Sequence, residues 1–236
     1  MISPEEFKRY SKQLLLEEIG YDGQVKLKSA KILVIGAGGL GCPALQYLTA
    51  AGVGAIGIAD FDVVDATNLH RQILYTAEEI GKHKTDIALS KLSALNPFVK
   101  FMPFKTMIDE TNAKKIIEGF DIVIDGSDNF MTRYIVNDAC VSLGKPLVYG
   151  SILGFEAQVA VFNHKGGRNL RDIFPEPPNP EDIPNCSQNG VLGTVTGMTG
   201  CLLANEAIKI ILNRDYLHNQ ILVINFTNFG LMKISF

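Results

Sequence analysis

The segment from Lys31 to Gly41 constrains the fold of this chain more than any other. Its apolar residues predict a strand, its glycines a tight turn, and the following segment Leu40–Ala51 a helix. The glycines match the spacing G-x-G-x-x-G at Gly36, Gly38 and Gly41. In such a turn, backbone N–H groups can approach a phosphate at the positive end of a helix. The segment therefore predicts a nucleotide site at the end of a buried strand.

An acidic residue supports this interpretation. A second expected strand, Ala55–Ala59, ends at Asp60, about 20 residues beyond the glycines, where a carboxylate can bond a ribose hydroxyl. The pattern indicates an adenine nucleotide and does not separate NAD from ATP. The alternative is that the glycines serve only the close packing of helix on strand.

Composition excludes several classes of protein. The chain of 236 residues is 47% hydrophobic, which is enough for a large core, and its net charge of −3 provides no basic surface for nucleic acid. We expect no membrane span and no signal peptide. Because the four cysteines include no CxxC pair, a disulfide framework is not expected and a reducing, cytoplasmic location is.

The N-terminal and central segments are expected to alternate between helices and strands. Ser3-Pro4-Glu5-Glu6 predicts a helix start, with Tyr10, Leu14, Leu15 and Ile19 on one side of the helix, and Thr76–Glu79 predicts a second start, of a helix ending before Asn96. The remaining expected elements up to Gly150 are strand 98–103, helix 109–118, strand 121–125, helix 130–143 and strand 146–149. Alternating strands and helices call for a parallel sheet.

After Gly150 the pattern changes. Phe155–Phe162 predicts an antiparallel strand, residues 163–190 a long loop, Gly193–Leu212 a helix, and 221–236 a hairpin. The fold class predicted is α/β: Rossmann-like, with a mostly parallel sheet, helices on both faces and antiparallel strands added at the C-terminal end. One domain would span 1–236, with a helical segment 3–28, a nucleotide-binding half 31–150 and a second half 151–236.

Polar residues gather where the expected strands end. Asn68, Arg71 and Gln72 could bind a triphosphate, since arginine offers forked donors. Lys84, beside Lys82, would stand in the first turn of a helix, where a cation is unfavourable unless an anion is bound nearby. Solvated surface residues are the alternative for both sets.

Taken together, the motifs resemble those of the MoeB/ThiF/HesA family, the bacterial relatives of ubiquitin-activating enzymes. The resemblance covers essentially the whole chain. The matching segments are Arg9-Tyr-Ser-Lys12-Gln13, Gly36–Gly41, Asp60-Phe-Asp62, Asn68-Leu-His-Arg71-Gln72, Lys84, Asp125-Gly-Ser-Asp128-Asn129, and Phe174–Pro178 leading to Cys186.

The resemblance implies an ATP-dependent adenylyltransferase. Its substrate would be the C-terminal glycine carboxylate of a small ubiquitin-like sulfur carrier, ThiS-like or MoaD-like, which becomes an acyl-adenylate. Because a carboxylate is already a nucleophile, this chemistry needs neutralised phosphates and positioning more than acid–base catalysis. The pathway, thiamine or molybdopterin synthesis, is left open. A sulfurtransferase or cysteine desulfurase is a further expected partner; nucleic acid and membrane are not.

The same resemblance implies roles for individual residues. Asp60 would hold the ribose, and Asn68, Arg71 and Lys84 the phosphates. Asp128 would ligate Mg²⁺, as a hard oxygen donor should, and Asn129 would shape the pocket. The expected cofactor-binding set is Gly36, Gly38, Gly39, Gly41, Asp60, Asp62, Asn68, Arg71, Gln72, Lys84, Asp128, Asn129 and Lys12, with Arg71, Lys84, Asp128 and Cys186 as the catalytic set.

Lys12 stands where the family has an arginine that reaches the ATP of a neighbouring subunit. The positive charge is kept and the forked geometry is lost. The resemblance therefore implies a homodimer in which Lys12 acts across the interface.

The family comparison also predicts that zinc is absent. Many relatives bind zinc through two CxxC pairs; here the first pair would fall at Asn169 and Asp172, and the second beyond Phe236. Asparagine and aspartate are poor zinc ligands compared with thiolates. The adenylation domain is expected to occupy the sequence to Phe236 without a sulfurtransferase domain, and a longer natural protein is left open.

Cys186 lies where some relatives take up the activated carrier or sulfur, in a polar loop that suits an accessible thiolate. An unreactive surface thiol is the alternative. Cys42, Cys140 and Cys201 are expected to be small core residues. The carrier is expected to dock near Phe155 and the 163–190 loop.

Three other functions compete with carrier activation. An NAD-dependent oxidoreductase would use the same glycine turn, although Asn68, Arg71 and Lys84 would then be surplus. A non-catalytic scaffold could bind a ubiquitin-like partner without chemistry. An adenylyltransferase could also act on another acceptor, such as a peptide or a modified tRNA base.

Overall fold

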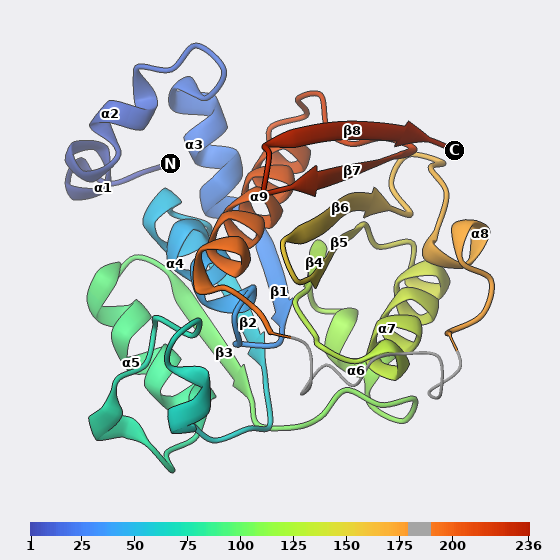
Figure 1. The fold of residues 1–236 in the computed structure, drawn as a ribbon. Coiled ribbons are helices and arrows are strands. Elements are labelled where there is room, and N and C mark those ends of the chain that lie inside the picture. The colour runs from blue at the N-terminus through green and yellow to red at the C-terminus, as the bar shows by residue number, and fades with distance from the viewer. Residues whose placement is uncertain (179–189) are drawn as a thin grey trace.

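An eight-stranded sheet runs through the part of the molecule that the structure describes, in the order β3-β2-β1-β4-β5-β6-β7-β8 (Figure 1). The computed structural model describes residues 1–178 and 190–236. Strands β3, β2, β1, β4 and β5 are parallel, whereas β6, β7 and β8 are antiparallel to their neighbours. The strands are β1 (Lys31–Ile35), β2 (Ala55–Ala59), β3 (Lys100–Phe104), β4 (Ile122–Asp125), β5 (Leu147–Leu153), β6 (Glu156–Phe162), β7 (Gln220–Asn225) and β8 (Gly230–Ser235). The predicted fold class is confirmed.

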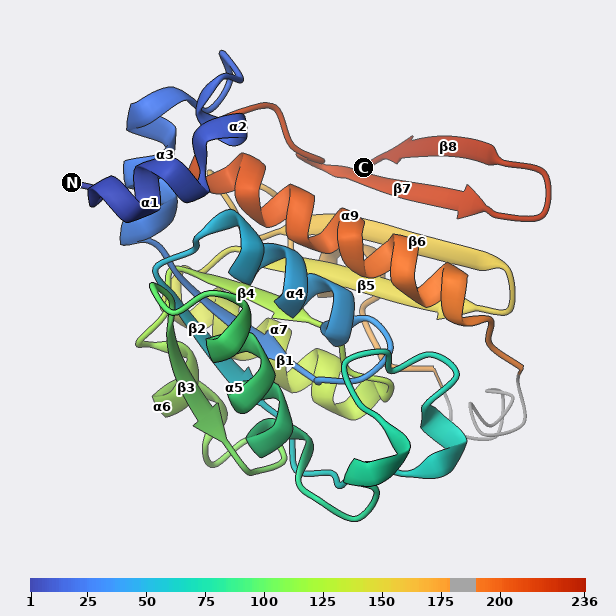
Figure 2. The ribbon, with the colours of Figure 1, turned by 90° about the vertical axis from the view of Figure 1, so that its left-hand side faces the viewer.

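Helices cover both faces of the sheet (Figure 2). Alternate residues of β1 separate two cores: Ile32 and Val34 pack beneath α4 and α9, whereas Leu33 and Ile35 pack beneath α6 and α7. This alternation follows from the two-residue period of a strand. The helices are α1 (Pro4–Arg9), α2 (Ser11–Leu14), α3 (Gly20–Ser29), α4 (Gly41–Ala51), α5 (Lys84–Leu95), α6 (Ala113–Ile117), α7 (Phe130–Leu143), α8 (Leu170–Ile173) and α9 (Gly193–Ile211).

The strand order creates a crevice between β1 and β4. The chain leaves β1 towards β2 and β3 on one side, and β4 and β5 lie on the other. Open α/β sheets bind ligands at such a reversal, outside the carboxyl ends of the strands. The turns that begin at Gly36 and Gly126 follow β1 and β4, so both lie at this edge.

The single N-terminal helix predicted from Ser3 to Ile19 is wrong. This span forms the short helices α1 and α2 instead, and α1 ends at Arg9, with Tyr10 between the two. Tyr10 is buried, and its hydroxyl accepts a hydrogen bond from Asn96 Nδ2 at 2.8 Å. Leu15 is 78% exposed. The break between α1 and α2 thus lies at Tyr10, whose side chain is buried in the domain, whereas Leu15 beyond α2 is largely exposed.

The helix expected to start at Thr76 begins eight residues later. Thr76 and Glu79 do form a capping box, but it closes only the 3-10 turn Ala77–Glu79. Helix α5 starts at Lys84. Residues 80–82 form a turn and a bend, and His83 makes an isolated antiparallel bridge to Val63. The helix therefore starts only after this tertiary contact.

Two other predictions are corrected in extent, and a third is confirmed. The helix expected over 109–118 is limited to α6, because Asp109 is used in a turn that accepts hydrogen bonds from Thr111. The loop expected over 163–190 contains α8. The C-terminal hairpin is confirmed, with Asn225 paired to Gly230 in register.

Candidate nucleotide-binding site

The first turn at the crevice is built by glycine. Gly36 has φ +84°, a left-handed conformation that favours glycine, and a Cβ on Gly41 would lie 1.8 Å from the Gly36 carbonyl oxygen. The N–H groups of Gly38, Gly39 and Leu40 donate no hydrogen bond to any other described residue. These donors, at the start of α4, suit a phosphate. The structure has the strand–turn–helix geometry on which the predicted phosphate site depends.

Asp60 holds this turn from below. Its Oδ2 accepts a hydrogen bond from the Ala37 N–H at 2.7 Å, and its Oδ1 accepts one from the Asp62 N–H at 2.8 Å. Burial raises the pKa of Asp60, and the positive charge of Lys84 and these N–H groups oppose that shift. Both oxygens therefore already serve the backbone, and a ribose bond would use their remaining lone pairs.

Lys84 is the first residue of α5 and is only 2% exposed. Its Nζ lies 2.8 Å from Asp62 Oδ2. The positive charge expected in the first turn of this helix is thus paired with the carboxylate of Asp62. The backbone N–H of Asp62 in turn donates a hydrogen bond to Asp60. Lys82 precedes the helix and is exposed.

The loop after β2 carries the other phosphate candidates. Arg71 Nη2 donates a hydrogen bond to Asn68 Oδ1 at 2.6 Å, which brings the two side chains together as predicted. Gln72 is buried against the glycine turn: a Cβ on Gly38 would lie 3.4 Å from its Nε2. The Oε1 of Gln72 is buried without a hydrogen-bond partner in the described residues.

The second turn at the crevice is built by side chains. Asp125 is fully buried, and its Oδ1 accepts hydrogen bonds from the N–H and Oγ of Ser127 at 2.9 and 2.6 Å. Burial raises the pKa of Asp125, and the charge of Arg133 opposes this. A Cβ on Gly36 would lie 2.7 Å from the Gly126 carbonyl oxygen, so the two turns touch.

Asp128 and Asn129 have different settings on this turn. Asp128 is exposed, and its carboxylate has no hydrogen-bond or ion-pair partner in residues 1–178 and 190–236. One free carboxylate beside a phosphate cradle fits Mg²⁺, which binds few protein ligands and takes phosphate oxygens besides. Asn129 caps α7, with its Oδ1 accepting from the Thr132 N–H at 2.9 Å.

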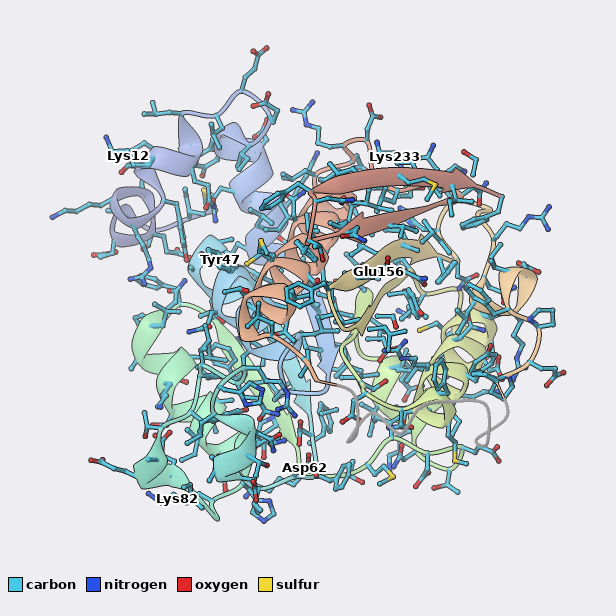
Figure 3. All side chains as sticks on the ribbon, in the orientation of Figure 1. Lys12, Tyr47, Asp62, Lys82, Glu156 and Lys233 are labelled. Atoms are coloured by element: carbon cyan, nitrogen blue, oxygen red, sulfur yellow. The ribbon has the colours of Figure 1, made fainter. Side chains whose placement is uncertain are left out.

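Lys12 does not join this group within one chain. Figure 3 shows it on the N-terminal helices, far across the molecule from Asp62 at the crevice. It is exposed on α2. An action on a nucleotide would therefore require a second subunit, as the prediction states.

The cysteine and zinc predictions have separate outcomes. Cys186 lies outside the described residues. Cys42 and Cys140 are buried as expected, which raises the pKa of each thiol to about 12, whereas Cys201 is half-buried. Asn169 and Asp172 bond to each other as the capping box of α8. No cluster of three or more metal-ligating side chains occurs among the described residues.

Two residues that contact the turns at the crevice were not predicted from the sequence. Tyr75 donates its hydroxyl hydrogen to the Ala37 carbonyl at 2.8 Å and so pins the first turn. Arg133, on α7, donates to the Ser127 carbonyl of the second turn at 3.0 Å. The sequence feature that could have indicated this role is the position of Arg133 on the same helix face as the buried residues Val136, Asn137 and Cys140. A charged side chain on a buried face needs a partner.

Comparison with known proteins agrees with this geometry. The model of the ThiF family matches residues 10–235. The chain belongs to the ThiF family. Among curated proteins, it is 53% identical over 210 residues to "Adenylyltransferase and sulfurtransferase MOCS3" of Culex quinquefasciatus, covering 89% of this chain and 48% of that protein. It is 48% identical over 213 residues to "Sulfur carrier protein adenylyltransferase" of Thermus thermophilus, covering 88% of this chain and 79% of that protein.

The solved structures support the fold of this ThiF-family chain. A crystal structure of E. coli MccB superposes with a TM-score of 0.85 at 23% identity, covering 96% of this chain and 72% of that one. PaaA gives a TM-score of 0.84 at 20% identity, covering 99% and 74%. The chain spans about half the length of the MOCS3 relatives. In the described ranges, no helix is both long enough and apolar enough to span a bilayer.

Proposed function

We propose that the chain is an ATP- and Mg²⁺-dependent adenylyltransferase that activates the C-terminal glycine carboxylate of a small ubiquitin-like sulfur carrier, ThiS-like or MoaD-like. Membership in the ThiF family and the printed activities of the Culex and Thermus relatives support this proposal. The carrier is used in thiamine or molybdopterin synthesis.

One observation carries the proposal: phosphate donors and a free carboxylate are linked by direct contacts at one sheet edge. Lys84 contacts Asp62, whose loop joins Asp60 and the first turn. That turn touches Gly126 on one side and Gln72, next to Arg71, on the other. A dinucleotide site would need the glycine turn and Asp60 but leave Arg71 and Lys84 without a role.

The chemistry that this arrangement would perform is a single displacement. An oxygen of the carrier carboxylate forms a bond to the α-phosphorus of ATP, and the bond from that phosphorus to the bridging oxygen of pyrophosphate breaks. The negative charge that grows on pyrophosphate is stabilised by Arg71 and Lys84, whose positions are fixed beforehand by Asn68 and Asp62. Asp128 would hold Mg²⁺, which would supply further positive charge at the phosphates.

The pairing of Lys84 with Asp62 is part of this proposal. A buried lysine needs a partner, and Asp62 provides one at 2.8 Å while remaining half exposed itself. A phosphate arriving at the crevice can therefore compete for Lys84 without the lysine losing its buried position. Asp62 thus belongs to the cofactor-binding set through Lys84.

Two contributions come from outside the crevice of one chain. The active unit is a homodimer, in which Lys12 reaches the nucleotide of the partner subunit. Cys186 takes up the activated carrier after adenylation: its thiolate forms a thioester with the glycine carbonyl carbon, and the bond from that carbon to the phosphate oxygen of AMP breaks. The carrier docks against the apolar surface near Phe155, which is 50% exposed at the turn between β5 and β6.

ATP–pyrophosphate exchange tests the proposal. Exchange should require one carrier that ends in Gly-Gly and should be lost in Asp128→Ala. Lys84→Met should lower the exchange rate by about a hundredfold, in line with the loss of one charge-stabilising donor. Lys12→Ala should also lower it, and mixing Lys12→Ala with Asp128→Ala chains should restore part of the rate if the lysine acts across subunits.

Two other results would redirect the interpretation. A thermal shift with NAD that exceeds the shift with ATP would favour the oxidoreductase. ATP binding without exchange for any carrier would favour another acceptor or a scaffold. Cys186→Ala should retain exchange, because adenylation precedes the use of the thiol.

A further inference from the structure

The turn that carries Asp128 is held from beneath by Arg133. This arginine is only 6% exposed on α7. Its Nη2 donates to the Ser127 carbonyl oxygen at 3.0 Å, and its Nη1 donates to the Tyr149 hydroxyl on β5 at 3.2 Å. The guanidinium also lies over the Tyr149 ring, with its central carbon 5.2 Å from the ring centroid. One side chain thus joins the turn to the neighbouring strand.

Asp125 holds the same residue from its other side. Asp125 Oδ1 accepts from both the N–H and the Oγ of Ser127, while Arg133 takes the Ser127 carbonyl. Every polar atom of Ser127 is therefore fixed by one of two buried, oppositely charged side chains. Their facing atoms, Asp125 Oδ2 and Arg133 Nε, lie 3.9 Å apart, and neither has another partner in the described residues.

The chain is fixed again immediately after Asp128. The Asn129 side chain accepts from the Thr132 N–H at 2.9 Å and so anchors the start of α7. Asp128 is the one residue between these two anchors, and its own carboxylate is exposed without a partner in the described ranges. The hydrogen bonds of its neighbours accordingly fix the backbone on both sides of Asp128, and with it the position from which the carboxylate extends.

We propose that Arg133 is a positioning residue for the reaction: by clamping Ser127 with its fork it orients the Asp128 carboxylate towards the metal and phosphates. This inference rests on the proposed function, which makes Asp128 the Mg²⁺ ligand. A lysine cannot replace the arginine, because one ammonium cannot reach the Ser127 carbonyl, the Tyr149 hydroxyl and Asp125 in the same planar geometry.

A purely structural role for Arg133 would have a different signature. It would lower the stability of the fold without changing how tightly the nucleotide site holds a divalent cation. A positioning role changes cation affinity in a folded protein, since partners of a metal ligand typically set about ten- to hundredfold of its affinity.

The experiment compares two Arg→Lys variants of the full chain. Arg171→Lys is the matched control, because Arg171 also pairs with an aspartate, Asp138, at 2.8 Å and also lies over a tyrosine ring, but it does so on α8. Electron paramagnetic resonance measures Mn²⁺ binding in the presence of ATP. Hydrogen–deuterium exchange measures the protection of amides in residues 126–129.

In Arg133→Lys we expect the dissociation constant of Mn²⁺ to rise about tenfold and the turn amides to exchange faster. Arg171→Lys should leave both measurements at the wild-type level. Tyr149→Phe removes only the hydroxyl that accepts from Arg133 and should shift both in the same direction by a smaller factor. It provides the readout if Arg133→Lys does not fold.

The outcomes separate this inference from the proposed function. Wild-type Mn²⁺ affinity and turn protection in folded Arg133→Lys, or in Tyr149→Phe where Arg133→Lys fails to fold, would overturn the positioning role. An equal loss in Arg171→Lys would also overturn it. Absence of pyrophosphate exchange in the wild-type chain would refute the proposed adenylyltransferase activity. Faster amide exchange of residues 126–129 in Arg133→Lys would still show that Arg133 holds this turn in place.

Discussion

The two turns at the crevice occupy equivalent places, after β1 and β4, and are built by opposite means. The first turn depends on missing side chains: a Cβ at Gly41 would meet the Gly36 carbonyl oxygen at 1.8 Å. The second depends on side chains that are present, because Asp125 and Arg133 fix the three polar atoms of Ser127. The first leaves backbone N–H groups without a partner in the described residues, which the proposal assigns to an anion, and the second exposes the Asp128 carboxylate, which the proposal assigns to a cation.

The difference explains how one edge can hold both charges of a metal–nucleotide complex. Donors that must approach a phosphate closely need a bare backbone, so glycine is required. A metal ligand needs a rigid side chain in a set direction, which a flexible glycine turn would not provide. Substitutions that disrupt the two turns by these different means should therefore lower the free energy of unfolding by different amounts.

The largest effect is expected for Arg133→Met. This change leaves the fully buried Asp125 without its cation, and breaking a buried pair costs about 3–5 kcal/mol. Urea unfolding monitored by circular dichroism measures the loss. The double variant Asp125→Asn/Arg133→Met should recover part of it, and a loss below about 1 kcal/mol in the single variant would contradict the clamp.

The first turn should break through overpacking. Gly41→Ala places a methyl group against the Gly36 carbonyl and should lower the free energy of unfolding by about 3 kcal/mol. Gly197→Ala is the control, since a Cβ at that position of α9 meets nothing within 4 Å. Its expected result is no loss, or a gain of up to about 1 kcal/mol from helix propensity. Equal stability of both variants would show that the first turn can relax.

A smaller effect is expected where a single hydrogen bond supports the first turn. Tyr75→Phe removes the bond to the Ala37 carbonyl and should cost about 1 kcal/mol, because that carbonyl retains a contact with the Cys42 thiol. Isothermal calorimetry should show weaker ATP binding in this variant with unchanged Mg²⁺ dependence. A changed Mg²⁺ dependence would mean that the two turns are not independent.

The smallest effect concerns pH. Burial raises the pKa of Asp60 above its unfolded value, so the stability linked to its protonated form is fully present below about pH 3.9 and is lost as pH rises through the folded pKa. The unfolding free energy of wild type minus that of Asp60→Asn should therefore fall as the pH rises above about 4. Urea titrations at several pH values test the sign, and a rising difference would contradict it.

Some of the site could be predicted because its physical cause is local. The spacing of Gly36, Gly38 and Gly41 reflects a close backbone approach, which lies within one strand–turn–helix unit. The Rossmann-like sheet followed from alternating apolar segments, and the change at Gly150 followed from the missing helix. Asn68 and Arg71 were predicted as one group because they lie three residues apart in a single turn.

Other features were decided only by the tertiary structure. The start of α5 moved from Thr76 to Lys84 because Val63 and His83 pair across the fold. Tyr10, at the break between α1 and α2, is bonded to Asn96, which is distant in sequence. Arg133 acquires its role from Ser127 and Tyr149, which only the packed sheet brings together. Local spacing predicted the glycine turn and the phosphate site proposed for it, whereas buried charges found their partners only when the strands were assembled, because the desolvation that makes those partners necessary does not exist in the unfolded chain.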